Sequence, residues 1–251
     1  MPNISKDIEQ TLKSLKTNHF DARFARNAAE AKAIMLEMIT VTSTIGVGDS
    51  VTLRQIGILD ELSRRGNKVI NPFTKGLTQD VAKHNLFIQT CRGTFGTDVF
   101  MAGCNAVTED GKVVSVDYAG NRVAGTIFGG NKVILAIGRN KIVRNLDEAI
   151  YRIKNVIAPF HAKYKGRKTP CAVTGKCNDC DSSARICNVT IILEKKLGHT
   201  DLSVILIDED LGLGWDPAWS EKRISKIKSE YCQNSWAFFT NEKVKSRKVP
   251  S

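Results

Sequence analysis

The order of apolar and polar positions along the chain predicts short strands that alternate with helices. Residues 132–138 form a nearly continuous apolar run, which is typical of a parallel strand buried on both faces. In residues 146–157, Leu146, Ile150 and Ile157 recur at helical spacing, and basic residues occupy the opposite face. Further strands are predicted at residues 40–47, 68–71, 98–102, 106–108, 112–117, 189–193 and 202–207.

Helical spacing of apolar residues also occurs in segments 4–38, 52–65 and 78–90, and Asp216-Pro217 predicts the start of a last helix. Alternating strands and helices around a buried strand favour an α/β fold with a mostly parallel sheet flanked by helices. The expected parts are an N-terminal helical segment (1–40), an α/β core (41–210) with a cysteine-rich loop insertion (170–188), and a C-terminal helix with a basic tail (211–251).

A glycine-containing segment, 46–52, lies between a predicted strand and a predicted helix. Glycines allow a tight turn and a close approach of a ligand, and the start of a helix offers N–H donors to an anion. Val51 occupies the position of the third glycine in a dinucleotide fingerprint, so a dinucleotide site is disfavoured. The alternative is a plain turn in which Asp49 or Ser50 caps the helix. The ligand-binding candidates here are Gly46, Gly48, Asp49, Ser50 and Thr52.

Further polar residues lie at the ends of predicted strands. Arg122 offers paired donors to a carboxylate or phosphate, and Lys141 offers a point charge. The candidate bases are Glu109 and Asp117. The alternatives are structural, because Glu109 falls in a predicted turn and Asp117 can form an ion pair with Arg122. The ligand-binding candidates in this group are Asn105, Asn121, Arg122 and Lys141.

The order of these motifs resembles the LUD domain family. The resemblance rests on the glycine segment, on GCNAVTEDG at 103–111, on GNRVA at 120–124, and on the apolar strand 132–138 followed by Asn140-Lys141. It extends over roughly residues 20–210 of the chain. The resemblance implies a NagB/RpiA/CoA-transferase-like fold, which is an α/β architecture.

The resemblance also implies a function in lactate utilization, by analogy with the lactate utilization protein C group. We expect a component of L-lactate or 2-hydroxy-acid oxidation that binds a small anionic substrate and works with iron–sulfur partner proteins. One alternative is a stand-alone isomerase- or transferase-like enzyme acting on a phosphorylated or CoA-linked anion. Another is a non-enzymatic metal or redox sensor, or an assembly factor. Whether the chain is itself an enzyme stays open, because no nucleophile–base pair is evident in the sequence.

Four of the seven cysteines fall in one short segment, with spacing C-x5-C-x2-C-x6-C. In a reducing compartment such a cluster favours a metal over disulfides. Only one short Cys-x2-Cys pair is present, whereas structural zinc sites usually have two, so the sequence favours a [4Fe-4S] cluster, with zinc as the alternative. The predicted metal ligands are Cys171, Cys177, Cys180 and Cys187.

Composition narrows the remaining possibilities. The formal net charge is +11, and segment 139–176 holds ten Lys or Arg residues against only Asp147 and Glu148. This excess attracts an anion or an acidic partner, or it forms a solvated basic face. No nucleic-acid-binding motif accompanies it, so the sequence disfavours nucleic acid as a partner. We expect a cytoplasmic protein without a membrane span, because no apolar run is long enough and the N-terminus lacks a secretory signal.

Overall fold

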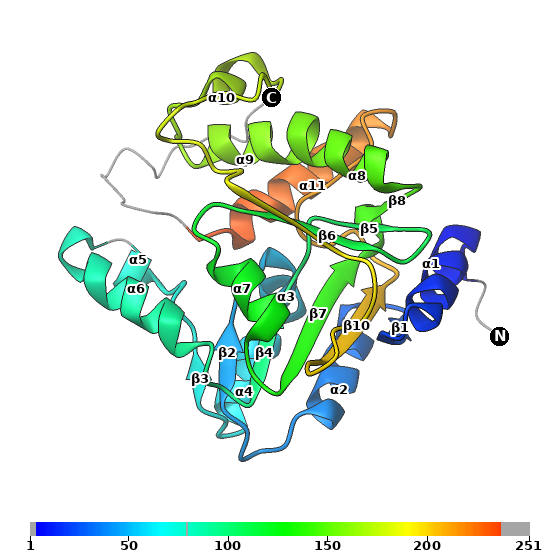
Figure 1. Cartoon of the computed structure of the whole chain (residues 1–251), viewed down its shortest axis with the longest axis vertical. Coiled ribbons are helices and arrows are strands. Elements are labelled where there is room, and N and C mark those ends of the chain that lie inside the picture. Colours follow the sequence, from blue (N-terminus) through cyan, green and yellow to red (C-terminus); the bar gives the residue numbers. More distant parts are fainter. Residues whose placement is uncertain (1–3, 79, 237–251) are drawn as a thin grey trace.

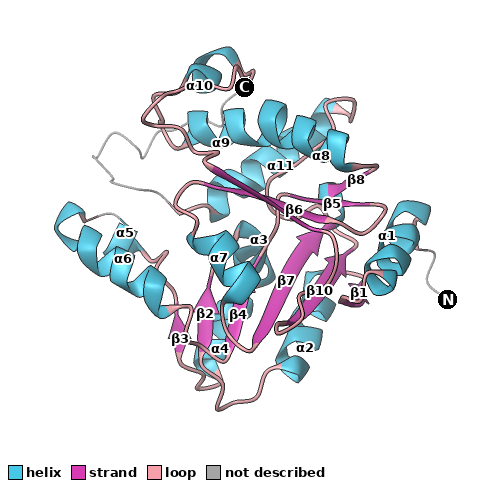
Figure 2. Ribbon diagram, viewed as in Figure 1, coloured by secondary structure: helices cyan, strands magenta, loops and turns pink. Residues whose placement is uncertain are grey.

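The computed structural model describes residues 4–78 and 80–236, which contain a six-stranded parallel sheet (Figure 2). In spatial order its strands are β1 (Asp21–Ala25), β10 (Asp201–Ile207), β7 (Lys132–Gly138), β4 (Val99–Ala102), β2 (Ile45–Val47) and β3 (Val69–Ile70). The side chains of β7 are buried on both faces of the sheet, as the apolar run predicted. The predicted mostly parallel α/β fold is confirmed.

A second, four-stranded sheet lies against one face of the first. Its strands are, in order, β8 (Ile142–Val143), β5 (Ala106–Thr108), β6 (Val113–Asp117) and β9 (Val189–Leu193). Strands β5 and β6 form the predicted antiparallel hairpin, and Gly111 in its turn has a positive φ of 82°. Val107 and Val113 pack against Phe100 and Leu135 of the larger sheet. The two sheets therefore share an apolar interface.

Helices complete the layers (Figure 1). The other face of the larger sheet is covered by α2 (Ala28–Met38), α3 (Val51–Ile56) and α4 (Ile58–Arg64). The second sheet shares its face of the larger sheet with α1 (Lys6–Thr17) and α7 (Asn121–Phe128). On the outer side of the second sheet lie α8 (Leu146–Arg152), the π-helical segment η3 (Ile153–Ile157), α9 (Ala158–Tyr164) and α11 (Glu221–Asn234).

Five further elements lie at the edges of these layers. Helix α5 (Lys75–Thr78), η1 (Val81–Lys83) and α6 (His84–Gly93) extend from the β3 edge of the larger sheet (Figure 1). The 3-10 turn η2 (Arg139–Lys141) follows β7, and α10 (Pro170–Thr174) opens the cysteine-rich segment.

The structure corrects several predicted elements. The segment expected to be one helix, 4–38, contains the edge strand β1, because tertiary pairing with β10 overrides the local helical preference. Gly57, with a φ of 68°, divides the helix expected at 52–65 into α3 and α4. The strand expected at 40–47 is only Ile45–Val47, and the last helix begins at Glu221 rather than near Asp216.

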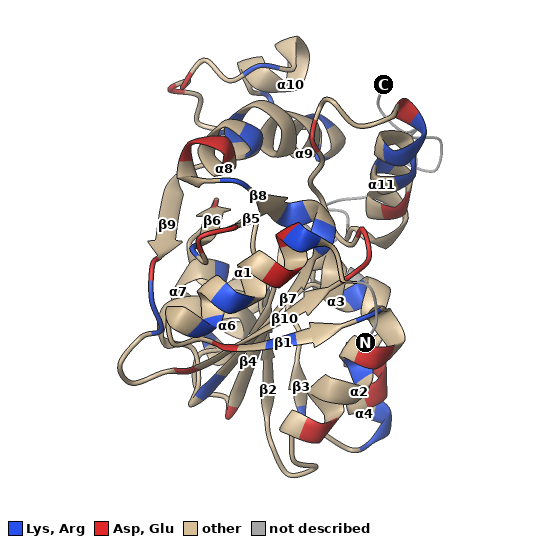
Figure 3. Cartoon of the chain, turned by 90° about the vertical axis from the view of Figure 1, so that its right-hand side faces the viewer, with Lys and Arg blue, Asp and Glu red and all other residues tan. Residues whose placement is uncertain are grey.

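Charges of both signs lie close together on α1, α8 and α11 (Figure 3). Of the basic run 139–176, Arg139 pairs with Asp208 and Asp210, and Lys154 pairs with Asp179. The excess seen in sequence is therefore partly neutralised by acids that lie later in the chain. No helix among the described residues is long and apolar enough to cross a membrane. Most of the predicted basic tail lies outside the described residues.

Candidate functional site

A cavity of about 260 Å³ lies at the carboxyl ends of the central parallel strands. Its wall includes Asp49 and Ser50 after β2, Cys104 after β4, Lys141 after β7 and Leu213 after β10. Parallel α/β sheets bind ligands beyond these strand ends. The loops there take no part in the hydrogen bonds of the sheet, and the connecting helices begin there. The position matches the expectation from the sequence.

Lys141 is the cation most enclosed by this wall, with only 5% of the residue exposed. Its Nζ donates a hydrogen bond to Thr52 Oγ1 at 3.1 Å, and among the described residues no carboxylate pairs with it. A Cβ on Gly212 would lie 2.8 Å from this Nζ, and one on Gly103 would lie 3.6 Å from it. Burial, together with the nearby Arg122 charge, lowers the pKa of Lys141 to about 8.

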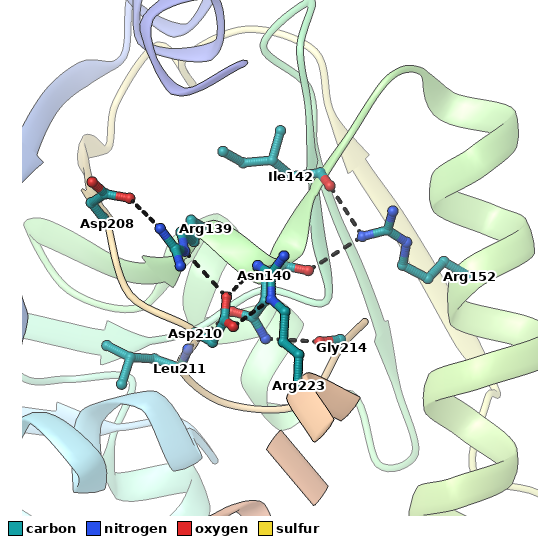
Figure 4. Close-up of polar contacts among 9 residues, drawn as sticks. All are labelled: Arg139, Asn140, Ile142, Arg152, Asp208, Asp210, Leu211, Gly214 and Arg223. Carbon is teal, nitrogen blue, oxygen red and sulfur yellow. Dashed lines mark hydrogen bonds and ion pairs between the residues drawn. The ribbon is translucent and has the colours of Figure 1, made fainter. Parts of the chain in front are cut away.

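The backbone around Lys141 is held by a buried polar network (Figure 4). Asn140, which is fully buried, accepts from Leu211 N at 3.0 Å and donates to Gly214 O at 2.9 Å. Arg152 donates to the carbonyls on both sides of Lys141, those of Asn140 and Ile142, at 3.2 and 3.1 Å. The loops after β7 and β10 are thus tied together, which fixes the direction of the lysine side chain.

Charged residues reinforce the same junction at its surface. Arg139 pairs with Asp208 at 3.0 Å and with Asp210 at 3.3 Å, and Asp210 also accepts from Arg223 at 2.6 Å (Figure 4). The two arginines hold the pKa of Asp210 below its ordinary value against the opposing effect of burial. The loop after β10 is therefore clamped to both η2 and α11.

The backbone of the glycine segment (46–52) contributes less to the cavity wall than the sequence suggested. A Cβ on Gly46 would lie 2.4 Å from Thr94 O, and one on Gly48 would lie 2.9 Å from the Phe100 ring. Both glycines are thus required by packing against neighbouring elements, and neither lines the cavity. Ser50 caps α3 by accepting from Leu53 N at 3.3 Å and also lines the cavity. Thr52 reaches the site through its bond to Lys141.

Arg122 joins the two sheets at the cavity wall. It donates to Gly103 O at 2.9 Å, to Val116 O at 2.6 Å and to Asn105 Oδ1 at 3.0 Å. Its Nε lies 3.6 Å from Asp117 Oδ2, in the ion pair that was the structural alternative. These contacts occupy most of the guanidinium donors. Arg122 therefore holds the wall residues in place and supplies positive charge to the cavity.

The other polar residues of this group also reach the wall. Asp117 Oδ1 accepts from the backbone N–H groups of Ala119 and Gly120, which shapes the turn before α7. Asn121, the first residue of α7, lines the cavity together with Asn105 and Asp117. The second candidate base, Glu109, is not brought to this cavity. It lines a separate surface hollow beside α1, and its backbone N–H bonds to Val143 O.

The far side of the cavity holds polar residues that sequence reasoning missed. His161 Nδ1 is hydrogen-bonded to the buried Tyr231 hydroxyl, and both residues line the cavity. Burial and the nearby cations of Lys165, Arg167 and Arg122 lower the pKa of His161 to about 3, so the ring is neutral at physiological pH. Burial also raises the pKa of the Tyr231 hydroxyl. This pair is therefore a neutral hydrogen-bonding unit.

Lys165 lies beside that pair, and its bonds are directed elsewhere. Its Nζ donates to Ser235 Oγ at 2.9 Å and to the Trp236 carbonyl, and it lies 4.1 Å from the centroid of a Trp236 ring. Burial is the main cause that lowers the pKa of Lys165 to about 8. A sequence signal for these residues existed: Ile153, Ile157, His161 and Lys165 recur every four residues, and all four line the cavity.

The cysteine-rich segment lies on the outer side of the α8–α9 layer (Figure 1). Cys171, Cys177, Cys180 and Cys187 are free, partly exposed thiols. Within residues 4–78 and 80–236, no three His, Cys, Asp or Glu side chains lie close enough to hold a metal ion. The described arrangement of the thiols therefore does not fit a cluster or a zinc ion, and a four-cysteine centre stays a prediction that requires the loop to rearrange.

Polar contacts nevertheless fold this loop onto the helix layer. Asn155 Oδ1 accepts from Cys177 N at 3.4 Å, and Lys154 bonds to Asp179 at 3.1 Å. Arg185 donates to Cys180 O at 2.8 Å and to Cys187 O at 3.3 Å. The backbones of two predicted ligands are thus held by one side chain, and the loop is anchored to the π-helical segment.

The chain was compared with solved structures, curated proteins and protein-family models. A crystal structure of a DUF162 family protein from Deinococcus radiodurans is similar to the chain, with 12% identity and a TM-score of 0.45, covering 81% of this chain and 99% of that one. No curated protein matches the chain. The family model described as the LUD domain matches residues 8–207, which is most of the chain. The chain belongs to the LUD domain family and is, at the level of that family, a lactate-utilization-type protein.

Proposed function

We propose that the cavity binds a small carboxylate of the 2-hydroxy-acid or 2-oxo-acid class, and that the chain is a component of L-lactate or 2-hydroxy-acid oxidation. The observation that carries the proposal is Lys141, a buried cation on the cavity wall with no carboxylate partner in the described part of the chain. A buried charge is costly unless something compensates it. An anionic ligand supplies that compensation.

The charge balance of the wall supports an anion. Its lining contains four cations, Lys141, Arg122, Lys165 and Arg167, and two carboxylates, Asp49 and Asp117. Asp117 is paired with Arg122, and Asp49 lies 3.6 Å from Arg54. The remaining field inside the cavity is positive, and its low dielectric strengthens the attraction for an anion.

The size of the cavity and its neutral polar groups support a small 2-substituted acid. A volume of about 260 Å³ falls below the usual range for larger ligands, roughly 300–1,000 Å³, so a whole CoA molecule does not fit inside. Asn121 and Ser50 lie on the wall and offer hydrogen bonds to a hydroxyl or carbonyl oxygen. Ile153 and Ile157 offer apolar contact to a short carbon chain.

Calorimetric titration tests the proposal with L-lactate, pyruvate, inorganic phosphate and ribose 5-phosphate as probes. We expect L-lactate or pyruvate to bind, and Lys141→Met to weaken that binding by roughly 30-fold or more, as expected for the loss of a charge-assisted contact. Lys163→Met is the matched control, because Lys163 is an exposed lysine of α9 that does not line the cavity.

Two outcomes would contradict the proposal. Binding of phosphate or ribose 5-phosphate without any binding of the carboxylates would favour the phosphorylated-substrate alternative. Equal loss of carboxylate binding in the Lys141 and Lys163 variants would show that general positive charge, rather than the cavity, attracts the acid. The partner proteins are tested separately, by co-purification of the chain with iron–sulfur proteins from cells that oxidise lactate.

A further inference from the structure

We propose that Lys141 is a nucleophile that forms a reversible imine with the carbonyl carbon of a 2-oxo acid bound in the cavity. This inference rests on the proposed function, because the charges of Arg122 and Arg167 on the wall hold the carboxylate of the ligand while the amine of Lys141 is neutral. It adds a covalent step that the binding of an anion alone does not require. A 2-oxo acid is the oxidised counterpart of a 2-hydroxy acid, so the same cavity suits both.

The surroundings of the Lys141 amine carry the inference. A lysine becomes a useful nucleophile when burial or a neighbouring cation favours its neutral form. Lys141 has both features, since it is 5% exposed and Arg122 lies across Gly103 from it. Its pKa is lowered to about 8, so roughly a tenth of the amine is neutral at pH 7, far more than in an ordinary lysine.

Nζ of Lys141 lies between two glycines, and all three residues line the cavity. Gly103 and Gly212 flank this atom, and a Cβ on Gly212 would lie only 2.8 Å away. Any larger residue at position 212 would therefore occupy the approach to the amine, and it would also be strained, because Gly212 has a φ of 72°. Because residues 103 and 212 are glycines, neither places a side chain between the amine and the cavity.

The second lysine of the cavity does not share these features. Lys165 donates to Ser235 Oγ and to the Trp236 carbonyl and contacts an aromatic ring, so its ammonium form is stabilised by several acceptors. Lys141 has the single hydroxyl of Thr52 as its hydrogen-bond partner among the described residues. The structure therefore assigns the nucleophilic role to Lys141.

The reaction balances without an oxidant or reductant. The lone pair of neutral Lys141 Nζ forms a bond to the carbonyl carbon, and the C=O π electrons move to the oxygen. A proton from nitrogen passes to that oxygen to give a carbinolamine, and Thr52 Oγ1, 3.1 Å from Nζ, can relay it. Loss of the protonated hydroxyl as water then gives the imine, so that amine and ketone yield imine and water.

Trapping with cyanoborohydride tests this step on the whole 251-residue chain. Wild-type protein is incubated with pyruvate and sodium cyanoborohydride, digested and mapped by mass spectrometry. We expect saturable labelling of the peptide that contains Lys141, at one adduct per chain. At pH 7–8 this lysine holds on the order of 100-fold more neutral amine than a surface lysine, so it is labelled first. L-Lactate, which has no carbonyl, protects the site and leaves no adduct itself.

The controls separate this inference from the proposed function. Lys141→Met abolishes the specific adduct, whereas Lys163→Met keeps it. If Lys141→Met does not fold, the peptide map of the wild-type protein still gives the result. Labelling confined to Lys165 or to surface lysines overturns the inference. If pyruvate binds by calorimetry and no adduct forms at Lys141, the imine is wrong while the carboxylate site stands. If neither pyruvate nor lactate binds and no adduct forms, both proposals fail.

Discussion

The cavity end of the parallel strands and the cysteine-rich segment (170–188) show two ways in which a sequence marks chemistry. At the cavity, Lys141 and Asn140 follow a buried strand, and hydrogen bonds fix the backbone on both sides of them. In the cysteine-rich segment the four thiols are partly exposed and are not gathered. At a strand end the sheet itself fixes the direction of the side chains. A loop motif supplies candidate metal ligands, but their geometry depends on the metal that they bind.

The largest contrast is expected from two Asn→Ala variants, one in each region. Asn140→Ala leaves the buried Leu211 N–H and Gly214 carbonyl without their partner, so the free energy of unfolding should fall by about 3 kcal/mol. Asn178→Ala changes an exposed residue of the cysteine-rich segment and should alter it by less than about 0.5 kcal/mol. Urea denaturation measures both. Similar values for the two variants would mean that the network does not set the stability of the cavity end.

Acid pH should also destabilise the cavity end. His161 has its pKa lowered from 6.5 to about 3, so the unfolded chain binds a proton there that the folded chain does not. Stability must therefore fall as the pH drops below 6.5, by about 2 kcal/mol between pH 6.5 and about pH 5 from this residue. His161→Gln, which keeps a hydrogen-bonding side chain for Tyr231, should reduce this slope. The comparison is made by urea denaturation at both pH values, and an unchanged slope in the variant would assign the acid sensitivity to other groups.

Replacing Lys141 should stabilise the free protein while it weakens ligand binding. Met has a similar length and no charge, so Lys141→Met should raise the free energy of unfolding by about 1–2 kcal/mol at neutral pH. Because the folded pKa of Lys141 is about 8 and its ordinary value is 10.5, the cost is fully present below pH 8 and is relieved as the pH rises toward 10.5. The gain in the variant should shrink over that interval. A destabilised variant at pH 7 would show that the ammonium is compensated in the free protein.

The smallest effect on the cavity should come from the cysteine-rich segment. Protein purified without oxygen is analysed for iron, sulfide and zinc, and about four irons per chain would establish a cubane cluster. Cys177→Ala should then lose the metal, while ligand affinity at the cavity changes by less than about twofold, because Cys177 does not line the cavity, which the segment reaches at Ile186. Cys91→Ala, a buried cysteine elsewhere, is the control and should keep the metal.

One zinc per chain would instead identify a structural zinc site that stabilises the loop. Protein without metal would show that the four residues are free thiols. A large loss of carboxylate affinity in Cys177→Ala would contradict the separation of the two regions, since it would mean that the loop and the cavity are coupled through Lys154 and Asn155.

The sequence predicted elements well where local pattern and tertiary environment agree. Strand β7 occupies the predicted residues, because burial on both faces leaves a continuous apolar run. Strand β1 was assigned to a helix, because Asp21 and Arg23 interrupt its apolar positions. An edge strand of this kind forms because it pairs with a neighbouring strand, here β10. The pairing with β10 is a long-range contact that no local window contains.

The candidate site shows the same limit. Lys141 was identified because it follows a strand, and a parallel sheet places such residues together. Arg122 was identified as well. Its donors are mostly bonded to Gly103, Asn105 and Val116, and no sequence pattern indicates these contacts. His161 was missed because its partner, Tyr231, lies 70 residues away. The four-residue repeat that contains it was visible, but the amphipathic pattern was followed only as far as Ile157.

The π-helical segment η3 has a consequence for how the chain can vary in length. Four-residue steps in an α-helix rotate by about 40° beyond a full turn, so three steps from Ile153 to Lys165 would spiral away from one face. The wider π turn absorbs one residue and cancels most of that rotation. Deleting a single residue between 153 and 157 would convert the π turn into an ordinary α-helical turn, and His161 and Lys165 would keep their direction. The π turn therefore lets this helix lose one residue without losing its contribution to the cavity.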